Sequence, residues 1–119
     1  MDISQTITRL KTRPGFLENV GMVLVHNGVV RATSRSGAKV SKLIVTPDQD
    51  KVESIRQDCL GEPGVFEILI EARGGTFVPG DDLLFIVVAG DIRENVLSAL
   101  TKTLTRVKAE AVAKKEILA

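Results

Sequence analysis

The residues of this chain that could do chemistry are mostly basic, and they fall near the expected ends of strands and helices. The set comprises Arg31, Arg73, Arg93, Lys108, Lys114 and Lys115. An arginine on the rigid end of a strand can hold a phosphate through two hydrogen bonds, and the first turn of a helix adds amides that favour an anion. For the last lysines, ordinary attraction of cations to a helix C-terminus is the competing explanation. The pattern indicates either a local anion site or plain surface charge.

Other familiar catalytic sets are missing. The sequence has no Ser-His-Asp set, no Walker-type phosphate loop and no GxGxxG motif. The single histidine, His26, lies in an apolar strand, where a histidine is more often a satisfied structural residue than a base. Asp81 and Asp82 fall in a turn, where solvation explains them. Cys59 is the only cysteine and is expected to fill the core, so we expect no disulfide, metal or cofactor.

Composition excludes several classes of protein. The 119 residues are enough for one domain, 1–119, and the 16 basic and 15 acidic residues leave a net charge of +1. Without Trp or Tyr, and without a basic excess, the chain is not expected to bind nucleic acid. The longest apolar run, Leu83–Gly90, is far shorter than the roughly 20 residues of a membrane span, and the charged start is no signal peptide. We therefore expect a cytoplasmic chain with no membrane partner.

The elements that must position the basic residues follow from periodicity. Helical spacing predicts a short helix within 1–13, a second one from Thr46-Pro47 to Gly61 with Val52, Ile55 and Cys59 on one face, and a long one from Asp91 that the lysines close, with Ile92 on its apolar stripe. Arg73-Gly74-Gly75 is expected to form a turn. Strands are expected at 21–31, with a bulge near Asn27-Gly28, and at 40–45, 65–72, 76–78 and 83–89. The last of these is apolar throughout, which predicts the centre of the sheet, covered on both faces. The order indicates an α+β fold with helices packed on a mainly antiparallel sheet.

Several motifs resemble those of the large, catalytic subunit of molybdopterin synthase, the MoaE family, from about Gly21 to Glu116. They are Gly28-Val29-Val30-Arg31, then Arg73-Gly74-Gly75 followed by Pro79-Gly80-Asp81, an arginine opening the final helix, and the ending Lys114-Lys115-Glu116. The resemblance implies an α/β hammerhead-like fold, a homodimer, and a pocket for the C-terminal tail of a small ubiquitin-like sulfur carrier. The carrier's thiocarboxylate would give sulfur to a cyclic pyranopterin monophosphate to form molybdopterin.

Roles are implied for individual residues by the same resemblance. Lys108 matches the first catalytic lysine of the family and Lys114 the second, with Lys115 an alternative because the spacing is one residue shorter. Arg31 and Arg93 match pocket arginines, and Arg73 and Lys115 complete the expected substrate-binding set. A lysine with a lowered pKa can act as an acid, a base or a nucleophile, while arginines hold phosphate.

The sequence also departs from the family pattern. Ala72 and Ile92 stand where the family has the histidine of a His-Arg pair, the Pro-x-Trp before the second lysine is absent, and Thr46-Pro47-Asp48-Gln49 replaces an aromatic-rich helix start. A proton carrier or phosphate ligand is therefore missing. Two hypotheses follow: a sulfur transferase acting through Lys108, or a non-catalytic module that binds the carrier or a pterin. A purely structural dimer is a third class.

Overall fold

The computed structural model describes all of residues 1–119 and contains eleven elements. In chain order they are α1 (Ile3–Lys11), α2 (Phe16–Asn19), β1 (Met22–Val29), β2 (Val40–Pro47), α3 (Gln49–Leu60), β3 (Val65–Ala72), β4 (Gly75–Phe77), β5 (Asp82–Gly90), α4 (Arg93–Arg106), a π-helical turn η1 (Val107–Ala111) and β6 (Val112–Leu118). The expected mixed class, with helices on antiparallel strands, is confirmed.

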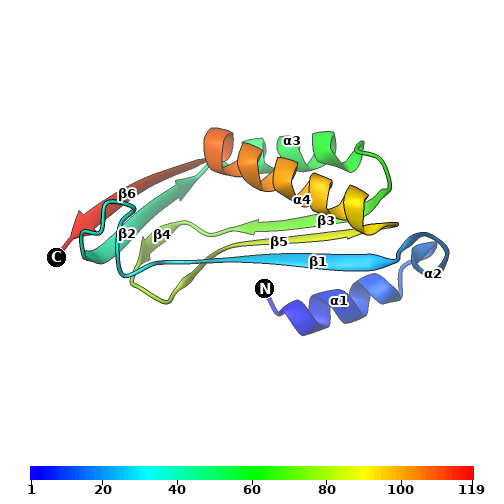
Figure 1. Ribbon diagram of the computed structural model, residues 1–119, viewed down its shortest axis with the longest axis horizontal. Helices are drawn as coiled ribbons and strands as arrows, with labels where there is room; N and C mark the ends of the chain where they lie inside the picture. The colour runs from blue at the N-terminus through cyan, green and yellow to red at the C-terminus, as the bar shows by residue number, and fades with distance from the viewer.

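The strands form two three-stranded sheets in which every pairing is antiparallel. The first has the order β1-β5-β3, and the second has the order β4-β2-β6. Helices α3 and α4 cover one face of the first sheet and α1 lies against the other, while the second sheet extends away toward the C-terminus (Figure 1). No helix is long and apolar enough to cross a membrane.

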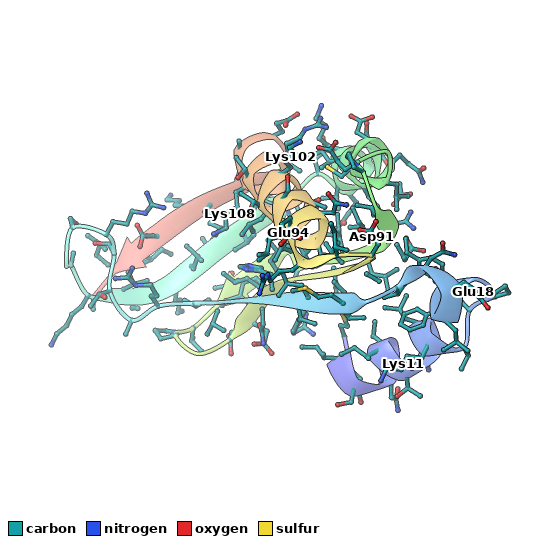
Figure 2. All side chains as sticks on the ribbon, turned by 45° about the vertical axis from the view of Figure 1, so that its right-hand side comes forward. Lys11, Glu18, Asp91, Glu94, Lys102 and Lys108 are labelled. Carbon is teal, nitrogen blue, oxygen red and sulfur yellow. The ribbon has the colours of Figure 1, made fainter.

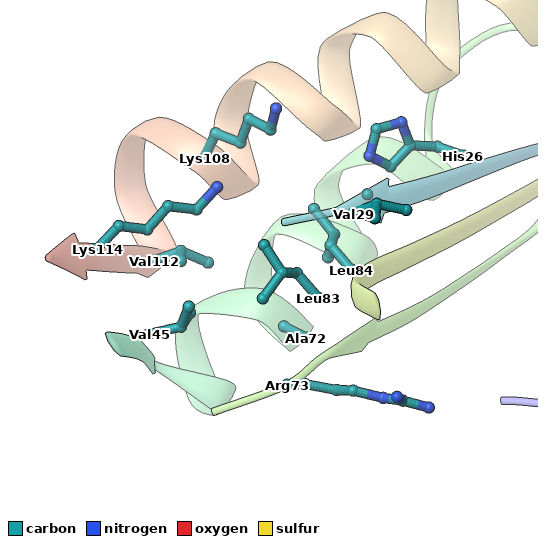
Figure 3. A pocket seen from close by; sticks show the side chains of 11 residues that line it. His26, Val29, Val45, Ala72, Arg73, Leu83, Leu84, Lys108, Val112 and Lys114 are labelled. Carbon is teal, nitrogen blue, oxygen red and sulfur yellow. The ribbon is translucent and has the colours of Figure 1, made fainter. Parts of the chain in front are cut away.

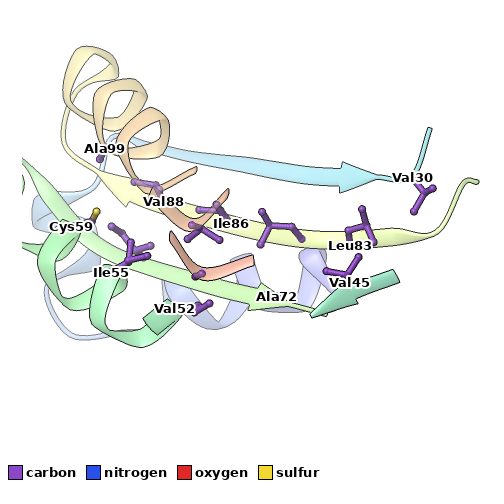
Figure 4. Packing of buried hydrophobic residues seen from close by; sticks show 14 of the residues in the cluster. Val30, Val45, Val52, Ile55, Cys59, Ala72, Leu83, Ile86, Val88 and Ala99 are labelled. Carbon is purple, nitrogen blue, oxygen red and sulfur yellow. The ribbon is translucent and has the colours of Figure 1, made fainter. Parts of the chain in front are cut away.

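Strand β5 is the centre of the first sheet and is buried from Leu83 to Gly90, as its continuous apolar sequence predicts. Because side chains alternate along a strand, Ile86 and Val88 join the core beneath α3 and α4 (Figure 4). Val87 and Ala89 point the other way and join a smaller cluster beneath α1. The larger core contains Cys59, so its expected role as a buried core residue is confirmed. The predicted bulge is also present, as a register shift between Gly28 and Val29.

A buried carboxylate ties three elements together at the far end of this sheet. Glu67 on β3 is 8% exposed; its Oε1 accepts hydrogen bonds from Arg56 Nη2 at 2.7 Å and from the Ile68 amide at 2.8 Å. Its other oxygen pairs with Arg13, in the segment between α1 and α2. Burial alone would raise the pKa of Glu67, but the bonds from Arg13, Ile68 and Arg56 outweigh it and lower that pKa.

Four expectations about local structure were wrong. The N-cap of the middle helix is Asp48, which accepts from Lys51 N at 3.1 Å, while Thr46 and Pro47 still belong to β2; aspartate is the better cap. Ile92 is not on the buried stripe of α4, since it is the N-cap residue and 54% exposed. The segment Arg73-Gly74-Gly75 is not a hairpin turn, because β4 pairs with β2 in the second sheet.

The fourth correction bears on function. The lysines at 114 and 115 do not close a helix: α4 ends at Arg106, and after the π-helical turn the chain continues as β6 along β2. The helical apolar stripe stops at Ala111, and the open edge of β2 offers the following backbone a ladder of hydrogen bonds. Helix-end attraction therefore does not explain these two cations.

Candidate functional site

Two connected pockets lie where the two sheets meet beneath the end of α4. The inner pocket has a volume of about 60 Å³ and is mostly apolar, with lining from β1, β2, β3, β5, η1 and β6. The outer basin is more open and measures about 500 Å³. Val29, Leu83, Lys108 and Lys114 line both, so the two lysines stand at the junction (Figure 3).

The π-helical turn η1 places Lys108 at this junction. Val107 and Ala111 of the turn are buried, which leaves Lys108 exposed on the pocket side. Such turns are rare and often occur at functional sites. The turn is held by Arg106, which donates to Glu110 Oε2 at 2.8 Å and to Asp58 Oδ2 at 2.9 Å, and by the Asp48 amide, which donates to Ala111 O at 2.7 Å.

Strand alternation decides which terminal lysine faces the pocket. Lys114 is opposite Val45, a lining residue of the inner pocket, whereas Lys115 is opposite Ile44 on the other face of the second sheet. The pKa of Lys114 is lowered, first by partial burial and then by the charges of Lys108 and Arg35, against which Glu116 acts weakly. Lys114 and Lys108 therefore lie together, and Lys115 does not line either pocket.

The outer basin gathers further positive charge from the segment that follows β1. Arg31 lines it, as does Arg35 from the loop between β1 and β2, which was not expected to take part. Arg31 Nη2 donates to Thr33 Oγ1 at 3.4 Å, and neither arginine forms an ion pair. Four cations line this basin against one carboxylate, Glu116, and none of them forms an ion pair, so the basin is a natural place for an anion.

His26 also lines the inner pocket and is the residue that the sequence did not single out as functional. It is on the helix-facing side of β1, and its ring points toward the space that the two lysines enter (Figure 3). Its Nε2 is buried and finds no hydrogen-bond partner, so it is not a satisfied structural histidine. Burial, then Lys108 and Lys114, lower its pKa below 6.5. The glycine two residues on, Gly28, was the available signal, because it leaves room for the ring.

Arg73 and Arg93, which were expected to bind substrate, do not place their guanidinium groups in this site within a single chain. Arg73 lines the inner pocket by position, but its guanidinium turns away, where it bonds Glu71 Oε2 at 2.9 Å and lies 5.2 Å from the Phe85 ring centroid (Figure 3). Arg93 is the first residue of α4, beside Glu94, whereas Lys108 lies in the π-helical turn that follows the last residue of α4 (Figure 2 labels Glu94 and Lys108). The substrate roles of Arg73 and Arg93 stay predictions.

The arrangement suits the binding and transformation of an anion. No carboxylate lines the inner pocket, the lysines bring two ammonium groups to its mouth, and the apolar walls limit competing water. The larger basin could take the phosphate of a small molecule, while the inner pocket is narrow. This division into a wide charged basin and a narrow apolar end fits a substrate bound outside and a reacting group presented inside.

Comparison with known proteins gives one family. The model of the MoaE protein family matches residues 1–110. Among solved structures, a molybdopterin synthase from Staphylococcus aureus is 25% identical, with a TM-score of 0.74 over 84% of this chain and 76% of that one. Molybdopterin cofactor biosynthesis protein E from Burkholderia multivorans is 19% identical, with a TM-score of 0.76 over 100% and 85%.

A third structure is a complex. It contains subunits 1 and 2 of the molybdopterin-converting factor from Helicobacter pylori; it is 17% identical, with a TM-score of 0.71 over 99% of this chain and 80% of that one. No curated protein matches the sequence significantly.

Proposed function

This chain belongs to the MoaE protein family, which gives it a role in molybdenum cofactor biosynthesis, and we propose that it is the sulfur-transferring large subunit of a molybdopterin synthase. In this proposal residues 1–119 act as one MoaE-like domain. The sulfur donor is a thiocarboxylate at the tail of a small ubiquitin-like carrier, and the acceptor is a cyclic pyranopterin monophosphate.

The observation that carries the proposal is the pair Lys108 and Lys114 at the junction of the two pockets. Neither forms an ion pair, and both face the space where a substrate in the outer basin would meet a chain end in the inner pocket. An anionic thiocarboxylate and an anionic phosphate both need such positive charge. Lys108 would stabilise the negative charge that develops as sulfur bonds to the pterin, while Lys114 and Arg31 would hold the phosphate.

The partner proposed for this chain is a carrier like the small subunit in the Helicobacter pylori complex. A narrow, apolar inner pocket suits an extended tail, since only small residues could pass beside Gly28 and Ala72. We also propose a homodimer. Arg93 is flanked by Ile92 and Leu97, which are 54% and 46% exposed, so a second chain packed on this patch could bring Arg93 to a pocket that its own chain cannot reach.

The decisive test is molybdopterin formation from cyclic pyranopterin monophosphate and a thiocarboxylated carrier. We expect wild-type protein to form product and Lys108→Ala to lose at least about 100-fold in rate, because positioned charge typically contributes that much. Lys102→Ala is the matched control, because Lys102 lies on α4, the helix just before the turn of Lys108, and pairs with Glu62 outside the pocket. A Lys108→Ala variant with full turnover would sink the site assignment.

The second candidate is a non-catalytic MoaE-like module that binds the carrier or a pterin. It is favoured by Ala72, which lines the inner pocket where the family has a histidine, and by the exposed Ile92. The same assay separates the two: a module would bind the thiocarboxylated carrier yet leave it unconsumed, in wild type and Lys108→Ala alike.

A further inference from the structure

The inner pocket holds one polar atom for which the chain provides no partner. His26 Nε2 is shielded from solvent and makes no hydrogen bond. Gly28 leaves space beside this atom, because a Cβ at position 28 would lie only 3.1 Å from it. A buried polar atom without a partner costs roughly 1–3 kcal/mol of stability. Such an atom is expected to bind a ligand or a water when the site is occupied.

The inner pocket has room for a water molecule. A water molecule needs about 10–15 Å³ of accessible space, and the inner pocket offers about 60 Å³. Its walls beside the imidazole are Gly28, Val29 and Leu84, which offer a water no side-chain hydrogen bond. A water there would bond to His26 Nε2 and, toward the mouth of the pocket, to the ammonium groups of Lys108 and Lys114.

Burial of the imidazole, and then the charged groups around it, favour its neutral form. Lys108 faces it from η1 and Lys114 from β6, while Arg73 of β3 turns its guanidinium away and no carboxylate lines the pocket. Of the lining side chains, only histidine ordinarily has a pKa below neutrality. The lowered pKa of His26 keeps it neutral at pH 7, so that it can accept a proton.

The proposed reaction needs such an acceptor. Once the thiocarboxylate sulfur has bonded to the pterin, a thioester joins the carrier tail to it, and the carrier can be released only when an oxygen replaces sulfur on the acyl carbon. That oxygen must come from water, because the carrier ends as a carboxylate. At neutral pH, water attacks a thioester faster when a base removes its proton.

We propose that His26 is the general base for this hydrolysis and takes the place of the histidine that the family has at position 72. This inference rests on the proposed function. Water adds to the acyl carbon, its proton passes to His26 Nε2, the carbon–oxygen bond forms and the carbon–sulfur bond breaks. Sulfur leaves on the pterin as a thiolate beside Lys108, the carrier leaves as a carboxylate after giving its second proton to solvent, and the imidazolium returns its proton to solvent.

The test compares wild type with His26→Phe and His26→Gln in single turnover with thiocarboxylated carrier and pterin, from pH 5 to 9. His26→Phe keeps an apolar ring, and Asn27→Ala, the exposed neighbour, is the matched control. We expect both His26 variants to form molybdopterin about 100-fold more slowly, to accumulate the carrier–pterin thioester by mass spectrometry, and to lose the fall in rate that wild type shows below pH 6.5.

The other outcomes each overturn something definite. Variants with wild-type rate and pH profile overturn the role of His26 while the proposed function stands. Slow variants that bind carrier weakly and accumulate no thioester make His26 a structural residue and also overturn it. A wild-type protein that forms neither thioester nor product overturns the proposed function, and the inference with it.

Discussion

Two clusters of charge, one around Glu67 on the first sheet and one where the two sheets meet, are built on opposite principles. Around Glu67, each oxygen of a buried carboxylate is paired with an arginine, and a backbone amide adds a third bond. Around Lys108, two lysines and two arginines face a common space that a single carboxylate, Glu116, also lines, and a buried imidazole nitrogen lacks a partner. Both contain several charges, but only the first is complete within the chain.

The difference separates structural charge from functional charge. Glu67 links β3 to α3 and to the segment after α1, so its pairs hold elements together. The pocket cations form no ion pairs that join elements, and the pKa of Lys114 is lowered first by its partial burial and then by the neighbouring charges of Lys108 and Arg35. Like charges held close together lower the stability of the folded chain unless a bound ligand of opposite charge neutralises them.

The largest expected effect on substrate binding is that of a charge reversal on β6, which tests whether the unpaired lysines serve function. Lys114→Glu places a carboxylate where we propose that the substrate phosphate binds, and like charges at close range cost several kcal/mol, so we expect the KM for the pterin to rise by about 100-fold or more. Lys115→Glu changes the same net charge on the opposite face and should alter KM less than about threefold. Steady-state kinetics of both variants measure this. Equal effects would mean that only net charge matters and that Lys114 does not face the substrate.

The next effect lies in the paired cluster. Glu67→Gln leaves Arg56 and Arg13 without their carboxylate, and hydrogen bonds to charged groups contribute roughly 1.5–3 kcal/mol, so we expect unfolding free energy to fall by about 2 kcal/mol. Urea denaturation measures this change, with Glu53→Gln, a more exposed partner of Arg56, as the control. Sulfur transfer should be unchanged at a temperature where the variant is folded. A loss of activity without loss of stability would contradict the division between the clusters.

Protonation tests the same cluster without mutation. The pKa of Glu67 is lowered in the folded chain, so its stabilising contribution is present above the ordinary value of 4.5 and is lost as pH falls through the folded pKa. Wild-type stability should therefore decline below pH 4.5 by more than that of Glu67→Gln, which has no proton to gain there. Thermal unfolding from pH 3 to 7 compares the two slopes, and parallel curves would show that Glu67 is not a source of acid sensitivity.

The sequence predicted the buried residues of strands and helices better than it predicted the candidate site. The apolar run of β5 and the helical spacing of Val52, Ile55 and Cys59 were enough to predict which side chains are buried, because burial follows periodicity within one element. Where the final helix would become a strand could not be predicted, since the ladder to β2 depends on an edge contributed by residues about 70 positions earlier. That error also hid the distinction between Lys114 and Lys115.

The sequence predicted three cations of the candidate site and missed one histidine and one arginine. Lys108, Lys114 and Arg31 were expected and do meet, whereas His26 was read as structural because a strand gives no sign of what lies over it. Its neighbours in the pocket come from six elements, so only the folded arrangement places the imidazole beside two lysines. Arg35 escaped notice for the same reason, in a loop with no periodicity.

The smallest predicted effect concerns a single proton. His26 is the only histidine, so its imidazole gives one resolved titration by NMR. We expect a pKa below 6.5, and a higher value in Lys108→Met, because removing a neighbouring positive charge makes the imidazolium less costly. Inorganic phosphate in the outer basin should raise it in the wild type as well, by partly neutralising Lys108 and Lys114. In Lys102→Met, whose lysine pairs with Glu62 outside the pocket, the titration should not move. If the pKa of His26 stayed constant in Lys108→Met and in phosphate, the unpaired charges would not share one space with the imidazole, and the contrast with the Glu67 cluster would lose its physical basis.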